Sequence, residues 1–326
     1  MSSGFMSKTC PVTVFKVNTP AVITLDKLKQ FAFQPIDELK TETKGVGWTS
    51  FDDMLDTAWS SSGPEYGEWL CFALRVDTRK IPAAVLKKHL AEAYKDELEK
   101  LQVEGKNFIS RGRKKELKEQ VQLRLLSQIQ PAPMVVDLAL DTSTGLLYAS
   151  TVSNPLLETL TDYLKTSFDM EPEELALAGL EARSADLQEA YAVESFLSGI
   201  YGHSADVELD GHSFTVAEAG EVTLGQADGR SVTTKNEQDS VMAGLQAGLY
   251  FQKLKMTLVR ADSGEQWTVT MDRGFRFPAL KCPVVIGDDK GGEKAEATRE
   301  GAVLERLYLI SQAVAVLHTL FRAQWA

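Results

Sequence analysis

The sequence predicts an α+β protein of more than one domain, in which antiparallel sheets carry packed helices and a basic pair of helices projects. The chain has 326 residues, and a single hydrophobic core rarely grows beyond about 250–300 residues. Short alternating apolar runs joined by turn residues occur in both halves of the chain, which is typical of β-hairpins. Apolar residues also recur every three or four positions over several longer segments, which indicates amphipathic helices.

The N-terminal segment predicts a small sheet with one helix. Residues 12–17 alternate as a strand, and residues 24–33 place apolar side chains at helical spacing. Residues 45–48, Gly-Val-Gly-Trp, are typical of a turn that leads into a short strand, and residues 68–76 predict a buried strand. Residues 1–19 contain neither the basic flank nor the long apolar core of a secretion signal. No stretch reaches the ~20 uncharged residues of a membrane span, so we expect a cytoplasmic protein.

Two amphipathic helices are predicted next, and they carry an excess of positive charge. Pro82 suits the first turn of the first helix, whose apolar residues recur at helical spacing as far as Leu101. The second helix covers residues 114–129. Residues 79–124 hold 13 Lys or Arg and 7 Asp or Glu, so the other 280 residues hold 22 and 39. We interpret this pair either as a strip that contacts a polyanion or as a solvated helical hairpin of mixed charge.

A hairpin, a helix and an acidic segment complete the first half. Residues 134–140 and 146–150 flank the turn sequence Asp-Thr-Ser-Thr-Gly, which predicts a hairpin. An Asn-Pro pair begins a predicted helix over residues 154–168. Residues 170–194 are rich in Asp and Glu and are interpreted as a linker that merges into a helix ending near Gly199.

The second half predicts another sheet and a long terminal helix. Short strands are expected between residues 214 and 224, a helix over 236–247, and two alternating strands over 251–271. Residues 288–296 predict a Gly- and Lys-rich loop, and residues 300–321 an amphipathic helix. We therefore divide the chain into an N-terminal α+β region (1–168, with the helical projection at about 80–130), an acidic linker and helix (169–202), and a C-terminal α+β region (203–326).

Motifs for catalysis are missing from the sequence. It contains neither the phosphate-binding string GxxxxGK[ST] nor the nucleophile string GxSxG. Cys10, Cys71 and Cys282 lie far apart and are expected to be reduced thiols in the core. Asp137 and Asp141 could hold a divalent metal, but Asp141 is more simply the first residue of a turn whose amides it caps. We therefore expect no enzyme activity, no catalytic residue, no metal and no cofactor.

A second group of basic residues is predicted in the sheet of the C-terminal region. Lys253 and Lys255 share one face of a strand, and Arg260 and Arg273 flank them. This face could lie along a phosphate backbone, or the lysines could protect an edge strand from aggregation. Neither basic group is interleaved with aromatic residues. Binding to nucleic acid would then be led by phosphates, independent of base sequence and weakened by salt.

Several short segments follow one another in a distinctive order. They are residues 31–35 (Phe-Ala-Phe-Gln-Pro) with Gly47 and Trp48, residues 81–90, residues 117–121 with Leu125 and Leu126, residues 141–147, and residues 246–254 with the strand pair and terminal helix after them. In their order and spacing, over nearly the whole chain, these segments resemble the family of the bacterial recombination-associated protein RdgC.

The resemblance implies an α+β protein that forms a homodimer and closes into a ring with a positively charged central hole for duplex DNA. Members of this family bind DNA with little sequence preference, inhibit RecA-dependent recombination by occupying its substrate, and are not enzymes. A cytoplasmic, nucleoid-associated protein is implied, and the DNA that it binds could be duplex or also single-stranded. An acidic exterior around a basic inner wall makes DNA binding compatible with the net charge of -11.

The candidate DNA contacts are the basic residues of the helical pair and of the sheet: Lys87, Lys88, Arg111, Arg113, Lys114, Lys115, Lys118, Lys253 and Lys255. Residues 126–133 correspond to a ring-closing segment of the family, and here they contain neither an aromatic residue nor an arginine. Two alternatives stay open. One is a protein-interaction module that acts on a recombination or replication protein directly, and the other is a metal-dependent nuclease.

Overall fold

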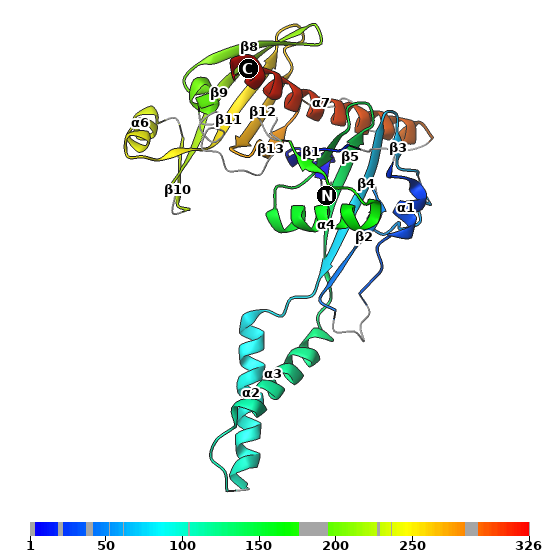
Figure 1. Ribbon diagram of the computed structural model, residues 1–326, viewed down its shortest axis with the longest axis vertical. Helices are drawn as coiled ribbons and strands as arrows, with labels where there is room; N and C mark the ends of the chain where they lie inside the picture. The colour runs from blue at the N-terminus through cyan, green and yellow to red at the C-terminus, as the bar shows by residue number, and fades with distance from the viewer. Residues whose placement is uncertain are drawn as a thin grey trace.

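The computed structural model shows a body of sheet and helices from which a narrow two-helix arm extends (Figure 1). The structure describes residues 4–325 except for 19–21, 37–41, 52, 61, 104, 176–194, 227–228, 236 and 284–292. The helices with defined bounds are the 3₁₀ turn η1 (Gly4–Met6), α1 (Leu25–Gln30), α2 (Ala83–Val103), α3 (Arg111–Leu126), α4 (Asn154–Phe168), α6 (Gln238–Gln246) and α7 (Glu293–Trp325). Residues 195–200 are helical too, where the sequence predicts a helix that ends near Gly199. The protein is therefore α+β, as the sequence predicts.

Thirteen strands of the described residues form one sheet, and the paired strands are antiparallel. The strands are β1 (Cys10–Lys16), β2 (Lys44–Ser50), β3 (Glu65–Tyr66), β4 (Trp69–Thr78), β5 (Ala132–Asp141), β6 (Leu146–Ala149), β7 (Glu173–Glu174), β8 (Ser204–Leu209), β9 (His212–Gly225), β10 (Ser231–Lys235), β11 (Tyr250–Arg260), β12 (Gln266–Asp272) and β13 (Phe277–Lys281). Their main order is β10-β9-β11-β12-β13-β1-β6-β5-β4-β2, with β3, β7 and β8 beside β4, β1 and β9.

Strand β1 connects the two halves of the sheet. Its residue Thr13 pairs with Ala149 of β6, while Cys10 pairs with Leu280 of β13. Each side of β1 therefore bonds a different half of the chain. The division into three regions stays a prediction. In the structure, β1 pairs with strands from both halves of the chain.

Helices α4 and α7 cover different parts of the sheet and build two hydrophobic clusters. On α7, the buried Arg306 donates to the carbonyl oxygens of Phe5 and Ser7 at 2.8 and 2.7 Å. At the other cluster, the indole N–H of Trp48 donates to the Ser167 hydroxyl of α4 at 3.0 Å. Buried polar groups thus have partners that hold each helix in place on its part of the sheet.

The terminal helix resembles a membrane span by composition but packs as part of the core. Within residues 299–323, a window of 18 residues reaches a mean hydropathy of 1.2, and 61% of that window is buried inside the structure. The indole N–H of Trp267 on β12 donates to the carbonyl oxygen of Leu309 at 2.9 Å, which ties the helix to the sheet. The apolar composition of α7 is therefore explained by its contact with the sheet.

The structure confirms most expected elements and corrects three. Residues 45–48 are not a turn, because they lie inside β2. The expected short strands between 214 and 224 are parts of one long strand, β9. Helix α7 begins at Glu293, inside the loop predicted over 288–296, because residues 293–298 include the good helix formers Glu, Lys and Ala. Residues 176–194 of the acidic linker lie outside the described residues.

Candidate nucleic-acid interface

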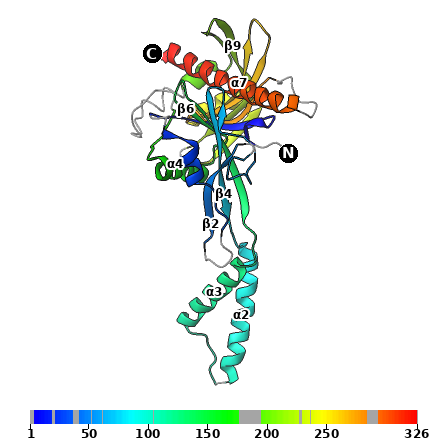
Figure 2. The same cartoon turned by 90° about the vertical axis from the view of Figure 1, so that its right-hand side faces the viewer.

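The arm consists of α2 and α3, which pack against each other and extend away from the sheet (Figures 1 and 2). Helix α3 buries Leu117, Val121 and Leu125, whereas α2 buries none of its described side chains. Two helices share only one contact seam, so most of their surface remains in water. The arm therefore presents long charged side chains at the surface.

The turn at the end of the arm is closed by two helix caps. Gly105 has a positive φ of 77°, and its N–H and that of Lys106 donate to the carbonyls of Gln102 and Leu101. These two bonds form a Schellman motif, for which glycine is the favoured residue. At the start of α3, the hydroxyl of Ser110 accepts from the Arg113 N–H at 3.2 Å. The caps direct the chain from one helix into the other.

Four of the predicted contact residues on the arm have side chains without an ion-pair partner among the described residues. They are Lys87, Arg111, Lys114 and Lys118, and all four are exposed. Lys88 and Lys115 lie 3.9 Å from Glu92 and Glu119, each one helical turn away. Such exposed pairs contribute at most about 1 kcal/mol, so they hold the lysines weakly. These six cations are accessible to an anionic ligand.

Arg113 differs from its neighbours because it joins the two helices. Its guanidinium donates to both carboxylate oxygens of Glu97 on α2, at 2.6 and 3.3 Å, and to Glu116 at 3.0 Å. The hydrogen bond from Arg113 lowers the pKa of the Glu97 carboxyl below its usual value. A guanidinium engaged by two carboxylates has fewer free donors for a phosphate. Its role as a DNA contact stays a prediction, and its structural role is to connect α2 and α3.

The lysines of β11 lie together on one face but are partly neutralised. Lys253 and Lys255 are half-buried. The Lys255 ammonium lies 3.6 Å from a carboxylate oxygen of Glu221, which also pairs with Lys235 at 3.5 Å. Lys253 pairs in register with Asp272 of β12. This face therefore offers less free positive charge than the arm.

Arg260 does not flank these lysines as the sequence predicted. Its side chain donates to Gln312 of α7 and lies 5.7 Å from the ring of Trp267, so it faces the helix side of the sheet. The cause is the strand alternation, which places Arg260 with the buried Leu258. Arg273 lies 4.3 Å over the ring of Tyr250, beyond the end of β12.

The two aspartates proposed for a metal hold the local structure instead. The buried Asp137 accepts from the Phe5 N–H at 3.1 Å. Burial acts to raise the pKa of Asp141, but hydrogen bonds from Ser143 and Thr144 outweigh it and lower the pKa. Asp141 therefore caps the hairpin turn, as the sequence suggested. In the described part of the chain, no group of three His, Cys, Asp or Glu could hold a metal ion.

The three cysteines are buried, and none of them forms a disulfide. Burial raises the pKa of Cys10, and it raises that of Cys282 to about 12. Protonated thiols in the core are poor nucleophiles and poor metal ligands. This confirms the expectation of reduced core thiols.

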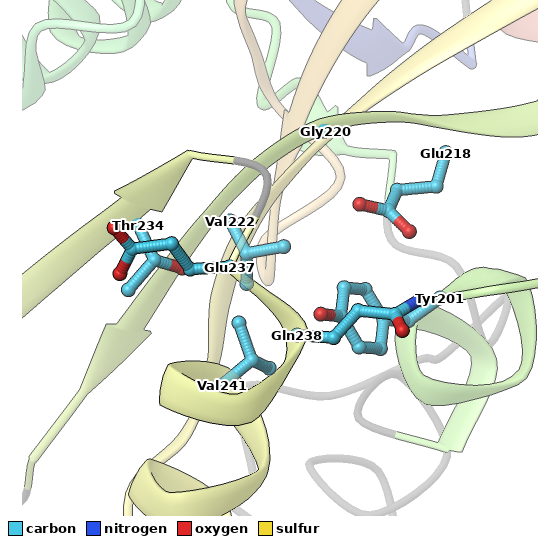
Figure 3. A pocket seen from close by; sticks show the side chains of 8 residues that line it. All are labelled: Tyr201, Glu218, Gly220, Val222, Thr234, Glu237, Gln238 and Val241. Carbon is cyan, nitrogen blue, oxygen red and sulfur yellow. The ribbon is translucent and has the colours of Figure 1, made fainter.

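A small pocket lies between β9, β10 and α6, and the sequence did not indicate it (Figure 3). It has a volume of about 330 Å³, and its lining includes Tyr201, Glu218 and Glu237. Glu218 accepts from the Gly202 N–H at 3.0 Å. Its lining contains carboxylates and no Lys or Arg, so it does not suit a phosphate. The pocket therefore plays no part in the basic interface.

The structure also places an aromatic residue in the basic arm, which the sequence analysis overlooked. Phe108 lies in the loop between α2 and α3 and is 74% exposed. A local signal was available, because Phe108 lies five residues before the Arg-Lys-Lys run that begins at Arg113. The sequence analysis looked for aromatic residues among the basic residues of a strand or helix, and Phe108 was overlooked because it lies in a loop.

A comparison with models of protein families gives a match. The family model described as "Putative exonuclease, RdgC" matches residues 11–196, which is more than half of the chain and includes the whole arm. No curated protein matches this chain.

Proposed function

This chain belongs to the RdgC family, and from that premise we propose that it binds duplex DNA without sequence preference and inhibits RecA-dependent recombination. The family is associated with DNA and recombination. Encircling of the DNA, inhibition of RecA and the homodimer are parts of the proposal. We also propose that the protein acts in the cytoplasm, associated with the nucleoid, and that it binds DNA without a cofactor or a catalytic step.

The observation that supports DNA binding is the separation of charge along the molecule. The chain carries a net charge of -11, but residues 79–124 contain six more basic than acidic residues. Four cations of the arm have no described ion-pair partner: Lys87, Arg111, Lys114 and Lys118. Free ammonium and guanidinium groups on a projecting element can reach phosphates, while the acidic body repels DNA from the rest of the surface.

The proposed ring would hold DNA more firmly than the arm of one chain could. In a homodimer, two arms and two β11 faces would surround the duplex and add their phosphate contacts. Such a complex would block RecA by occupying its DNA substrate. Because phosphates carry no base information, the binding would be independent of sequence.

Charge reversal on the arm tests this function. We expect Lys114→Glu, Lys115→Glu and Lys118→Glu together to abolish both DNA binding in a gel-shift titration and inhibition of RecA strand exchange. Wild-type affinity should fall with salt on a log–log plot with a slope of roughly -0.9 per neutralised phosphate. Lys29→Glu on the exposed surface of α1 is the matched control.

The outcomes separate the proposal from a direct interaction with protein. If the triple variant loses DNA binding but still inhibits RecA, inhibition acts through a protein contact and the DNA-occlusion model is wrong. Affinity that does not change between low and high salt would also contradict it.

The family description names an exonuclease, so nuclease activity is the second candidate. We expect linear and plasmid DNA to remain intact after incubation with the protein and magnesium, because Asp137 and Asp141 are engaged in hydrogen bonds to the protein. Shortened or nicked DNA, absent when EDTA is added, would instead support an exonuclease or a metal-dependent nuclease.

A further inference from the structure

Phe108 is an exposed aromatic residue in the loop that joins α2 and α3, and it packs in neither hydrophobic cluster of the described residues. Its side chain is 74% exposed. Tyr94, the other aromatic residue in the sequence of the arm, packs differently, since its hydroxyl donates to the Lys114 carbonyl between the helices at 3.4 Å. A ligand that covered this ring of Phe108 would remove apolar surface from water, which is favourable.

The loop that carries Phe108 is anchored at both ends. The Schellman motif at Gly105 closes α2, and the side chain of Ser110 caps α3. Only five residues, 106–110, connect these anchors. The ring is thus held on a short connection between helix ends, which lowers the entropy that binding would cost.

The surroundings of Phe108 favour a polyanion over an apolar protein groove. Residues 105–115 contain five cations and no carboxylate: Lys106, Arg111, Arg113, Lys114 and Lys115. Arg111 and Lys114 are exposed and lack a described ion-pair partner. An aromatic ring beside free cations is the combination that binds a nucleotide, because the ring stacks on the base while the cations contact its phosphates.

We propose that Phe108 stacks on an unpaired base, so that the arm prefers DNA with single-stranded or unstacked nucleotides over continuous duplex. The inference rests on the proposed DNA-binding function and adds a substrate preference to it. In continuous duplex the base faces are covered by their neighbours, so Phe108 gains little there and the phosphate contacts dominate.

The test compares Phe108→Ala with wild type on two ligands of equal length, a thymidine single strand and a blunt continuous duplex. Removal of one base–aromatic stack should weaken single-strand binding roughly 5- to 150-fold in fluorescence anisotropy. Duplex affinity should stay within about twofold, because phosphates supply it. Phe108→Tyr should keep wild-type affinity for both, since its ring also stacks.

A second readout detects the stack directly. A single strand containing 2-aminopurine should lose fluorescence when it binds wild-type protein or Phe108→Tyr, and should stay bright with Phe108→Ala. Val103→Ala is the matched control, because Val103 is 90% exposed on the same arm and lacks a ring. Circular dichroism checks that the variants keep their helices.

Each other outcome overturns the inference in a distinguishable way. If wild type binds DNA and Phe108→Ala binds each ligand with the same affinity as wild type, the stack is absent while the proposed function stands. An equal loss on both ligands would mean that Phe108 supports the arm rather than a base. If Phe108→Ala instead changes self-association in sedimentation, the ring contacts a second copy. If wild type binds neither DNA, both proposals fail.

Discussion

At the scale of single residues, neighbouring cations on the arm differ because of what lies opposite them. Arg113 is engaged by Glu97 and Glu116, whereas the side chain of Lys114, one position later, has no described ion-pair partner. The helical rotation of about 100° between them turns one side chain toward α2 and the other to water. We therefore expect Lys114 to contact phosphate directly and Arg113 to act mainly by holding α2 and α3 together.

Substitution of Lys114 tests the free cation. We expect Lys114→Ala to weaken DNA binding to all sequences alike and to reduce the salt slope by about 1, because one phosphate contact is lost. Anisotropy titrations at several salt concentrations measure the slope. Lys29→Ala on α1 should leave it unchanged. A slope that stays constant in Lys114→Ala would show that this lysine does not contact phosphate.

His318 gives the stability of the protein a dependence on pH. Burial against the core, where its ring lies 5.9 Å from that of Phe275, and the nearby Arg322 lower its pKa below 6.5. Above about pH 6.5 the histidine is neutral in both folded and unfolded chains. Below it the unfolded chain binds a proton that the folded chain does not, so the free energy of unfolding falls.

We therefore expect His318→Gln to lose less stability than wild type between about pH 8 and about pH 5. Urea unfolding at both values measures the difference, and the value at the higher pH corrects for any packing cost of the substitution. Parallel pH dependence in the two proteins would contradict the assigned pKa direction.

At the scale of elements, β2 depends on a close approach of two backbones. A Cβ on Gly47 would lie 2.1 Å from the Phe33 Cα and 2.3 Å from its nitrogen. Here the Phe33 N–H donates to the Trp48 carbonyl at 2.9 Å, and the Trp48 N–H donates to the Phe31 carbonyl at 3.1 Å. Glycine in this strand therefore allows residues 31–33 to pair with β2.

Because of this contact, we expect substitution of two nearby glycines, Gly47 and Gly45, to cost different amounts of stability. Gly47→Ala should lower the free energy of unfolding by about 3 kcal/mol, because backbone atoms must move. Gly45→Ala should cost about 1 kcal/mol, since its new methyl is crowded by the Ile36 side chain at 2.9 Å, which can rotate, and meets Phe33 and Gln34 at the ordinary contact distances of 3.5 and 3.6 Å. Urea unfolding compares them. Equal losses would refute the role given to the Phe33 backbone.

Arg276 connects elements from the two halves of the chain. It lies just before β13, its guanidinium donates to both carboxylate oxygens of Glu174 on β7, and it bonds the Asn154 side chain at the start of α4. Only 23% of its side chain is exposed. Partial burial makes this bidentate pair stronger than a pair in water.

We expect Arg276→Ala to lower the free energy of unfolding by about 1.5–3 kcal/mol. Lys165→Ala removes the exposed pair between Lys165 and Glu171 and should cost at most about 1 kcal/mol. Chemical denaturation of both variants gives the comparison. A cost for Arg276→Ala no larger than that for Lys165→Ala would show that the junction does not depend on this pair.

At the scale of the whole molecule, the arm lies far from strand β11, which carries Lys253 and Lys255 (Figure 1). One chain therefore does not gather them into one binding wall. A second copy that places its own arm and sheet around the same DNA would do so, which is why the proposed function includes a homodimer.

Light scattering measures this assembly. We expect a mass near twice 35.9 kDa in dilute solution, because long-lasting encirclement of DNA needs a dimer that persists without it. The charge-reversed arm variant should keep that mass while it loses DNA binding, if the substituted lysines contact DNA rather than the partner. A mass of one chain at all concentrations would exclude a closed ring.

The sequence by itself determined the elements, because alternation and helical spacing are local properties of the chain. The strand at 12–17, the helices of the arm and the hairpin capped by Asp141 all follow from a few neighbouring residues. The charge excess of the arm is likewise a property of composition. The prediction of a turn at residues 45–48 was wrong, because glycines that are typical of a turn also occur in a strand that another backbone approaches closely.

Only the tertiary structure decided which side chains are available to a ligand. Arg260 faces α7, Arg113 joins two helices, and Phe108 is exposed to water in the loop between α2 and α3. The physical reason is that a side chain's freedom depends on partners distant in sequence. The carboxylates that neutralise a side chain and the rings that cover it come from other elements, so a local sequence pattern does not predict them.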